Sequence, residues 1–325
     1  MDFEIFSDET HIENKNGKEY LGIGCLFVPA SYKHTLTKKL SDLRCLNENC
    51  RTWTWNYNDC KYSCKEKYHN LNNFEIHSKK IEKGMSRSKL RIYERWIRFV
   101  VNHNKHKEDK DKLLYFSILY LDLEKLDFDV FGVNKDTTNI YNRFFRTVLL
   151  SANSFYFKDV DFTIKNVFHD IADDKQVHDY FDWHSLDYLK SKRVNVKTNK
   201  INFISSNHRD YGDLEQKENA QLIQLIDLIL GCSNQILFGA SKDKNKIKIA
   251  SEFYPLFKRL WNHPYRFNSS FNYVRSQQVS IFPKTSIKSQ IDFDGSYKDV
   301  NQFHNDLEIT DPESLIEQSS LDNWF

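Results

Sequence analysis

The sequence predicts an α/β protein in which helices cover a mixed β-sheet. Two apolar stretches, residues 3–9 and 20–28, flank a turn containing Asn and Gly, and this pattern is typical of an antiparallel hairpin. Helical and strand-like segments alternate after the hairpin. Residues 222–231 are apolar on nearly every side, which predicts a buried helix. A hairpin followed by alternating helices and strands fits one mixed sheet with helices packed on it.

The remaining elements follow from the spacing of apolar residues. Apolar side chains three or four positions apart predict a helix, and short runs of β-branched and aromatic residues predict a strand. Residues 250–275 are rich in aromatic side chains and are expected to cover the core. The predicted helices span residues 31–46, 88–101, 141–151, 175–191 and 215–232. The predicted strands after the hairpin span residues 113–123, 162–170 and 201–204.

Composition restricts the function classes. The chain has 325 residues, 40% of them hydrophobic, and a formal net charge of +2, so a sizeable core is expected and a polycationic protein is excluded. The sequence has no run of about 18 apolar residues and no signal-peptide pattern, which predicts a cytoplasmic protein with no membrane partner. Six Cys in such a chain argue against a disulfide framework.

The helix predicted over residues 215–232 carries an acidic residue that is expected to be buried. Ala220, Gln224, Asp227 and Gly231 share one helix face because they lie at i, i+4, i+7 and i+11. Asp227 then needs a partner, a proton or a metal, since an uncompensated buried charge is costly. The small residues are expected to let the helix approach the sheet, and Gln224 to support Asp227. A plain hydrogen bond from Asp227 to a neighbouring segment is the alternative.

Two more carboxylates end predicted strands. Asp8 shares a strand face with Phe6, and Asp170 shares a face with Phe168. Carboxylates gathered at the edge of a sheet are suitable ligands for Mg²⁺ or Mn²⁺, and such ions can activate a water in phosphodiester hydrolysis. One further acid is expected to complete the set: Glu75, or else Glu9 or Asp122.

Short motifs occur in the order of one known family. They are Asp8-Glu9-Thr10, Tyr20-Leu21-Gly22-Ile23-Gly24, Glu75-Ile76-His77, Val167-Phe168-His169-Asp170, and Ser206 followed by Gln224-Leu225-Ile226-Asp227-Leu228. Together, over residues 3–235, they resemble domain-of-unknown-function family 3800 of the ribonuclease H-like clan. Thr10 and His11 stand where that family usually has Ser-Gly, and a Cys-containing segment and an acidic end are additions.

The resemblance implies a ribonuclease H-like domain over residues 1–240 and a metal-dependent nuclease that hydrolyses DNA or RNA. One or two Mg²⁺ or Mn²⁺ ions would bind to Asp8, Glu75, Asp170 and Asp227. His77 would transfer protons or orient Glu75. Family members often occur in mobile elements and anti-phage systems, which implies a defence role with a partner protein. The alternative is a non-catalytic module that binds nucleic acid or protein, since fold alone does not establish activity.

A basic stretch follows Glu75 and leads into a predicted helix. Its cations are expected to hold the phosphates of a nucleic acid beside the acidic residues. A solvated helix face fits the same pattern, and the sequence leaves both interpretations open. The cations are Lys79, Lys80, Arg87, Arg91, Arg95 and Arg98.

Residues 45–72 resemble an insertion that contains four cysteines within twenty residues. Such a group is compatible with a structural Zn²⁺ site. The spacings are x4, x9 and x3 rather than the usual x2 pairs, so free or buried cysteines are the favoured interpretation. The cysteines are Cys45, Cys50, Cys60 and Cys64.

The end of the chain turns acidic. Residues 291–325 contain nine acidic residues and a single cation, Lys298, which predicts a partly ordered tail. Residues 241–290 are expected to form an aromatic-rich extension that packs on the core. One hypothesis is that the acidic tail covers the basic surface and restrains nucleic-acid binding. The sequence leaves the oligomeric state open.

Overall fold

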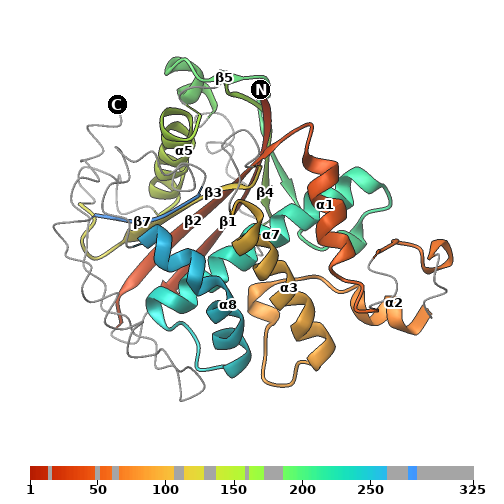
Figure 1. Ribbon diagram of the computed structural model, residues 1–325. Coiled ribbons are helices and arrows are strands. Elements are labelled where there is room, and N and C mark those ends of the chain that lie inside the picture. Colours follow the sequence, from red (N-terminus) through yellow and green to blue (C-terminus); the bar gives the residue numbers. More distant parts are fainter. Residues whose placement is uncertain are drawn as a thin grey trace.

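The chain folds as a mixed β-sheet with helices on both faces (Figure 1), which confirms the predicted α/β class. The structure is a computed structural model, and it describes residues 1–13, 17–47, 52–60, 66–105, 113–127, 137–157, 161–171, 186–261 and 277–283. The strands are β1 (Asp2–Glu13), β2 (Glu19–Pro29), β3 (Tyr115–Asp122), β4 (Thr163–Asp170), β5 (Asn195–Val196), β6 (Ile201–Ile204) and β7 (Gln277–Phe282).

The seven strands are ordered β5-β4-β1-β2-β3-β7, and β6 also pairs with β4. β2 is antiparallel to β1 and to β3, so the predicted hairpin is confirmed. β1 runs parallel to β4, and β3 runs parallel to β7. β5 pairs with the beginning of β4 and β6 with its end. These two short strands therefore form one interrupted edge of the sheet.

The helices divide between the two faces of the sheet. Figure 1 shows α5 on one face and α1, α3, α7 and α8 on the other. The helices are α1 (Lys33–Asp42), α2 (Glu66–Asn72), α3 (Arg87–His103), α5 (Thr137–Phe155), α7 (Leu214–Phe238) and α8 (Lys244–Trp261). Single 3-10 turns lie at η1 (Tyr57–Asp59), η2 (Ser78–Lys80) and η5 (His208–Asp210).

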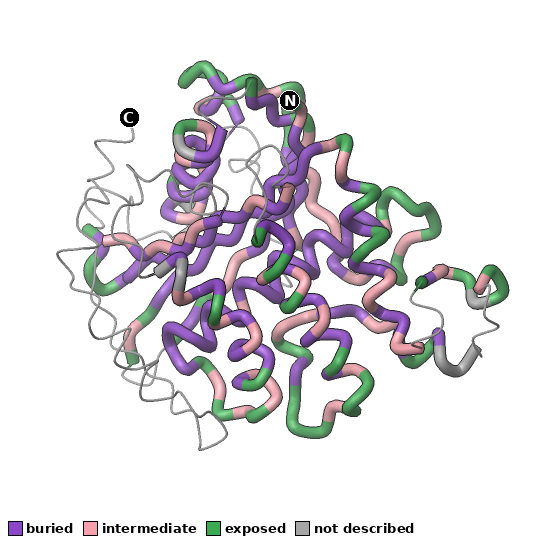
Figure 2. The backbone as a smooth tube through the Cα atoms, viewed as in Figure 1, coloured by how far each residue is buried: buried purple, intermediate pink, exposed green. Residues whose placement is uncertain are grey.

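Successive side chains along the strands point to opposite faces of the sheet and pack into two separate hydrophobic cores. Ile5 and Ile23 join the core under α5, whereas Phe6 and Leu26 join the core under α7. Figure 2 shows the central strands and α7 as almost continuously buried. A sheet covered on both faces explains why its central strands are apolar on both sides.

The helix predicted over residues 215–232 is α7, which continues six residues further, to Phe238. The side chain of Asp213 caps its start by accepting a hydrogen bond from the amide of Gln216 (2.8 Å), and Gly239 ends it in the left-handed conformation, with φ of 58°. By length and composition α7 is apolar enough to cross a membrane, but 89% of the relevant window is buried inside the fold. Its apolar surface is thus accounted for by core packing.

Glycine lets α7 approach the sheet closely, although at a different position from the predicted one. A Cβ on Gly24 of β2 would lie 2.6 Å from Leu230 Cδ1 of α7. Gly231 of α7 instead faces Ser78 of η2, where an added Cβ would overlap the serine. Gly231 was predicted to face the sheet, and that prediction is wrong because the other side of α7 makes the sheet contact.

Two strands were not predicted. β5 is only two residues long, and β7 comes from the extension after α8, so neither has a strong strand pattern of its own. Phe253 and Phe257 of α8 are buried in the same core as α7. Residues 175–185 of the predicted helix 175–191 lie outside the described residues, as does the acidic tail 291–325. Residues 186–191 are helical, as expected.

Candidate functional site

Asp8 and Asp170 end adjacent parallel strands on the same face of the sheet. β1 and β4 pair in register at Phe6 with Phe168 and at Ser7 with His169, and the acids are the next residue on each strand. The Phe6 and Phe168 rings stack with their centroids 5.1 Å apart. The predicted face of each acid is therefore confirmed. The carboxyl ends of parallel strands are a common location for functional groups in α/β proteins.

Asp227 joins these acids from α7, and its carboxylate is held by the segment before α3. Oδ1 accepts a hydrogen bond from the Ser78 hydroxyl (2.8 Å), and Oδ2 accepts one from the Ser78 amide (2.6 Å). Nδ1 of His77 lies 3.1 Å from the same Oδ2. The hydrogen bond considered for Asp227 as an alternative is thus present, and it involves a residue that the sequence did not single out.

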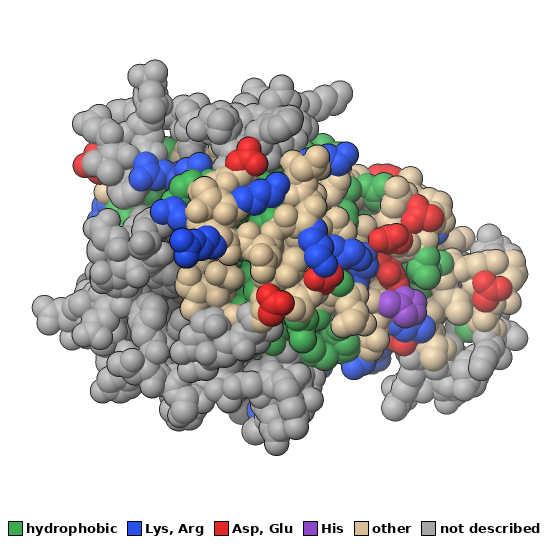
Figure 3. All heavy atoms as spheres, turned by 90° about the horizontal axis from the view of Figure 1, so that it is seen from above, with side chains coloured by type: hydrophobic (Ala, Val, Ile, Leu, Met, Phe, Trp, Pro, Cys, Tyr) green, Lys and Arg blue, Asp and Glu red, His purple; other side chains and the backbone are tan. Residues whose placement is uncertain are grey.

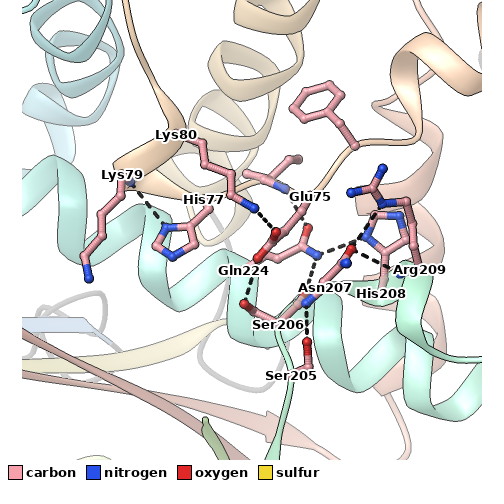
Figure 4. Close-up of polar contacts among 12 residues, drawn as sticks. Glu75, His77, Lys79, Lys80, Ser205, Ser206, Asn207, His208, Arg209 and Gln224 are labelled. Atoms are coloured by element: carbon pink, nitrogen blue, oxygen red, sulfur yellow. Dashed lines mark hydrogen bonds and ion pairs between the residues drawn. The ribbon is translucent and has the colours of Figure 1, made fainter. Parts of the chain in front are cut away.

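Ser206 links Glu75 to Asp170, and Figure 4 shows its contact with Glu75. Its hydroxyl donates to Glu75 Oε1 (2.9 Å), and its amide donates to Asp170 Oδ1 (3.1 Å). Glu75 is 7% exposed and also forms an ion pair with Lys80. One serine in the loop after β6 therefore fixes the spacing between two of the predicted site acids.

Burial and the closeness of these carboxylates change their pKa values. Burial and then the charges of Asp227, Glu9 and Asp170 raise the pKa of Asp8 well above its ordinary value. Burial is also the main reason that the pKa of Asp170 rises to about 6. Buried carboxylates that repel one another favour either a shared proton or a bound cation.

His77 is the titratable group that offsets part of this negative charge. Burial opposes its protonation, but the hydrogen bond and charge of Asp227, followed by the charges of Glu75 and Asp170, outweigh burial and raise the pKa of His77. The protonated ring donates from Nδ1 to Asp227. In the neutral ring Nδ1 is free to accept from the amide of Lys79, 3.3 Å away (Figure 4).

Gln224 lies one turn before Asp227 and joins three chain segments, whereas its support of Asp227 stays a prediction. Its Oε1 accepts from the Ile76 amide (3.1 Å) and from the guanidinium of Arg44 (3.0 Å). Its Nε2 donates to the Ser206 carbonyl (2.6 Å). Arg44 is fully buried, and burial lowers its pKa to about 9, so it stays charged at neutral pH. Sequence analysis missed Arg44 because nothing near it in the sequence marks it as buried.

A second polar group lies on the opposite face of the same strand ends. Nδ1 of His169 donates to the Asp170 carbonyl (2.8 Å), because a carbonyl can only accept. Nε2 then accepts from the hydroxyl of Tyr141 on α5 (2.6 Å) and lies 3.2 Å from Glu9 Oε2. His169 was visible in the sequence only as the neighbour of Asp170, and Tyr141 carried no signal.

Oxygen donors fit a hard divalent cation, but most of these oxygens already have protein partners. Within the described part of the chain, no group of three or more His, Cys, Asp or Glu side chains is arranged to hold a metal ion. Asp227 uses both oxygens on Ser78, and Glu75 uses both on Ser206 and Lys80. Asp8 and Asp170 each have one oxygen that makes no hydrogen bond to the described residues. These two acids are the better candidates for cation ligands.

The remaining candidates lie elsewhere or serve other contacts. Asp122 ends β3 beside Tyr20, two strands away from Asp8. Cys45 is buried and Cys60 is half-buried, whereas Cys50 and Cys64 lie outside the described residues.

Several cations of the predicted basic surface already bind protein acceptors. Arg95 donates to the Cys45 carbonyl (2.7 Å), Arg98 pairs with Glu252 (2.7 Å) and Lys80 pairs with Glu75. The exposed cations of that set are Lys79, Arg87 and Arg91 together with the paired Lys80 and Arg98.

Comparison of the chain with models of known protein families finds no match, and comparison with curated proteins finds none either. The similarity to family 3800 therefore rests on the motifs in this sequence.

Proposed function

We propose that this protein is a metal-dependent nuclease on a ribonuclease H-like scaffold. The observation that carries the proposal is the convergence of Asp8 and Asp170 at adjacent strand ends, beside Asp227. The strand order β3-β2-β1-β4, with β2 antiparallel to both neighbours, supports the ribonuclease H-like assignment. Mg²⁺ or Mn²⁺ at these oxygens would activate the attacking water and neutralise developing negative charge. A role in anti-phage defence is part of the proposal only through the family resemblance.

Each side chain has a separate role in this proposal. Asp8 and Asp170 hold the cation with the oxygens that no described residue uses. Glu75 is kept in place by Ser206 and Lys80. Asp227 orients His77 through Nδ1, so Nε2 is the ring nitrogen that exchanges a proton with substrate or water.

The test compares wild type with Asp8→Asn on DNA, RNA and hybrid substrates, with and without Mn²⁺. Wild type is expected to cleave at least one substrate only with Mn²⁺, and Asp8→Asn is expected to lose most of that activity. Lys242→Gln, an exposed change that touches neither the acids nor a proposed binding surface, serves as a folding and handling control. Wild type and Asp8→Asn that are equally inert or equally active would contradict the proposal.

A second candidate is a non-catalytic module that binds nucleic acid or a partner protein. The observation that favours it is the use of both Asp227 oxygens and both Glu75 oxygens by protein donors. This candidate predicts salt-sensitive binding without cleavage, unchanged by Asp8→Asn.

A further inference from the structure

We infer that the edge of the sheet formed by β5 and β6 binds the phosphate backbone of a nucleic acid and leads it toward the acidic site. Residues 188–209 contain six Lys or Arg residues and no Asp or Glu. The cations are Lys190, Lys192, Arg193, Lys197, Lys200 and Arg209, and each is exposed. We call them the edge cations. The inference deepens the proposed function, on which it rests, by assigning the surface that would hold the substrate.

The edge cations are all exposed, although several of them contact neighbouring residues. Lys197 forms an ion pair with Asp2 (2.8 Å), Arg209 donates to Asn207 Oδ1 (3.2 Å), and the ammonium of Lys192 lies over the Tyr188 ring. On α3, Arg95 and Arg98 bind protein acceptors. Figure 3 views the molecule from the side where β5 lies and shows Lys and Arg side chains spread over this face. Phosphate contacts need such solvent-facing cations.

The path from the edge cations to the site is continuous in the chain. Lys197 donates its amide to the carbonyl of Ile164 in β4 (2.8 Å), and β6 then pairs with β4 from Ile201 to Ile204. Ile204 is the partner of Asp170, and Ser206 contacts both Asp170 and Glu75. Lys200 precedes Ile204 by four residues, which is on the order of 13 Å along a strand. The segment that carries the edge cations thus also carries Ser206, which contacts two of the acids.

Edge strands often carry lysines for another reason, because charge discourages pairing with the edge of a second molecule. That purpose places charges on the paired strand itself. Here β5 is Asn195–Val196 and β6 is Ile201–Ile204, and neither contains a cation. The edge cations lie before, between and after the two strands, at exposed positions that a phosphate backbone can reach.

The test measures binding by fluorescence anisotropy with labelled single-stranded DNA and RNA oligonucleotides, in EDTA so that cleavage cannot occur, over a range of NaCl concentrations. The variant is Lys190→Gln/Lys192→Gln/Lys200→Gln. The matched control, Lys83→Gln/Lys105→Gln/Lys242→Gln, removes the same three charges from exposed positions outside both the edge cations and the predicted basic surface of α3. Thermal melts establish that both variants are folded.

The edge variant is expected to reduce the slope of log K against log salt by about 2, since each phosphate contact on a single strand contributes about 0.7. The control is expected to keep the wild-type slope. A control that loses as much as the edge variant, an edge variant with unchanged binding, or a wild type that does not bind would each overturn the inference. A protein that binds through the edge cations but never cleaves would overturn the nuclease proposal alone.

Discussion

Ser206 donates its hydroxyl to Oε1 of Glu75 over 2.9 Å, and this contact joins two segments that are 131 residues apart in the chain. The acceptor is a buried carboxylate, so the loss of this donor leaves Glu75 with only Lys80 as a partner. The geometry of the site therefore depends on a residue that would not touch the reacting atoms.

Ser206→Ala is expected to lower the free energy of unfolding by about 1–3 kcal/mol, because a hydrogen bond to a buried charged group is lost. It is also expected to reduce any Mn²⁺-dependent cleavage. The control is Ser205→Ala, whose hydroxyl donates to the exposed Asp210 (2.7 Å) and accepts from the Asn207 amide (3.1 Å); because these partners are not buried charges, its loss should cost less, about 0.5–1 kcal/mol. Urea denaturation and cleavage assays measure the two effects. Equal losses of stability and of cleavage in the two variants would contradict the role assigned to Ser206.

The metal-free protein is expected to lose thermal stability as pH rises from 5 to 8. Asp170 has a folded-state pKa of about 6 against an ordinary value of 3.8, so between these values the folded protein keeps a proton that the unfolded chain has released. Stability then falls with increasing pH. The raised pKa of His77 acts in the same direction, since its stabilising charge is lost as pH passes through that pKa.

Melting temperatures at several pH values test this expectation. Asp170→Asn should flatten the decline, whereas Asp187→Asn, the same chemical change at an exposed position, should leave it unchanged. Mn²⁺ is expected to restore melting temperature at pH 8 in wild type. A pH profile of Asp170→Asn that matches wild type would show that Asp170 does not carry the effect.

Gly231→Ala is expected to destabilise the protein by about 1–3 kcal/mol, because the new methyl group overlaps the side chain of Ser78. The displaced Ser78 would also weaken its two hydrogen bonds to Asp227. Gly84→Ala is the control, since a Cβ there meets no atom within 4 Å. Chemical denaturation of both variants gives the comparison, and a Gly231→Ala protein as stable as Gly84→Ala would contradict the close contact.

Gln224→Leu is expected to cost roughly 3 kcal/mol or more, since it removes partners from the Ile76 amide, the Ser206 carbonyl and the buried guanidinium of Arg44. Gln221→Leu, one turn earlier and equally buried, loses a single hydrogen bond to Ser41 and should cost about 1 kcal/mol. Urea unfolding curves with similar slopes would allow direct comparison. Similar costs for the two variants would show that Gln224 does not join the segments energetically.

The site was predictable where a local pattern determines the direction of a side chain. Period-two alternation gave the shared faces of Asp8 with Phe6 and of Asp170 with Phe168, and helical spacing put Gln224 and Asp227 on one face. The donors to these acids were not predictable, because Ser78 reaches Asp227 only after α7 has packed against η2. Charges in α3 were misleading for the same reason: the partner of Arg98 is Glu252, 154 residues away.

The position of β7 at the edge of the sheet has a consequence for synthesis of the chain. β3 is complete at residue 122, but its outer neighbour β7 begins only at residue 277, so 155 positions separate them. At about 5–20 residues per second, the ribosome leaves the outer side of β3 without its partner for roughly 8–31 s. During that interval the nascent chain presents an unpaired apolar edge. We therefore expect the yield of folded protein to increase with more chaperone and at a lower growth temperature.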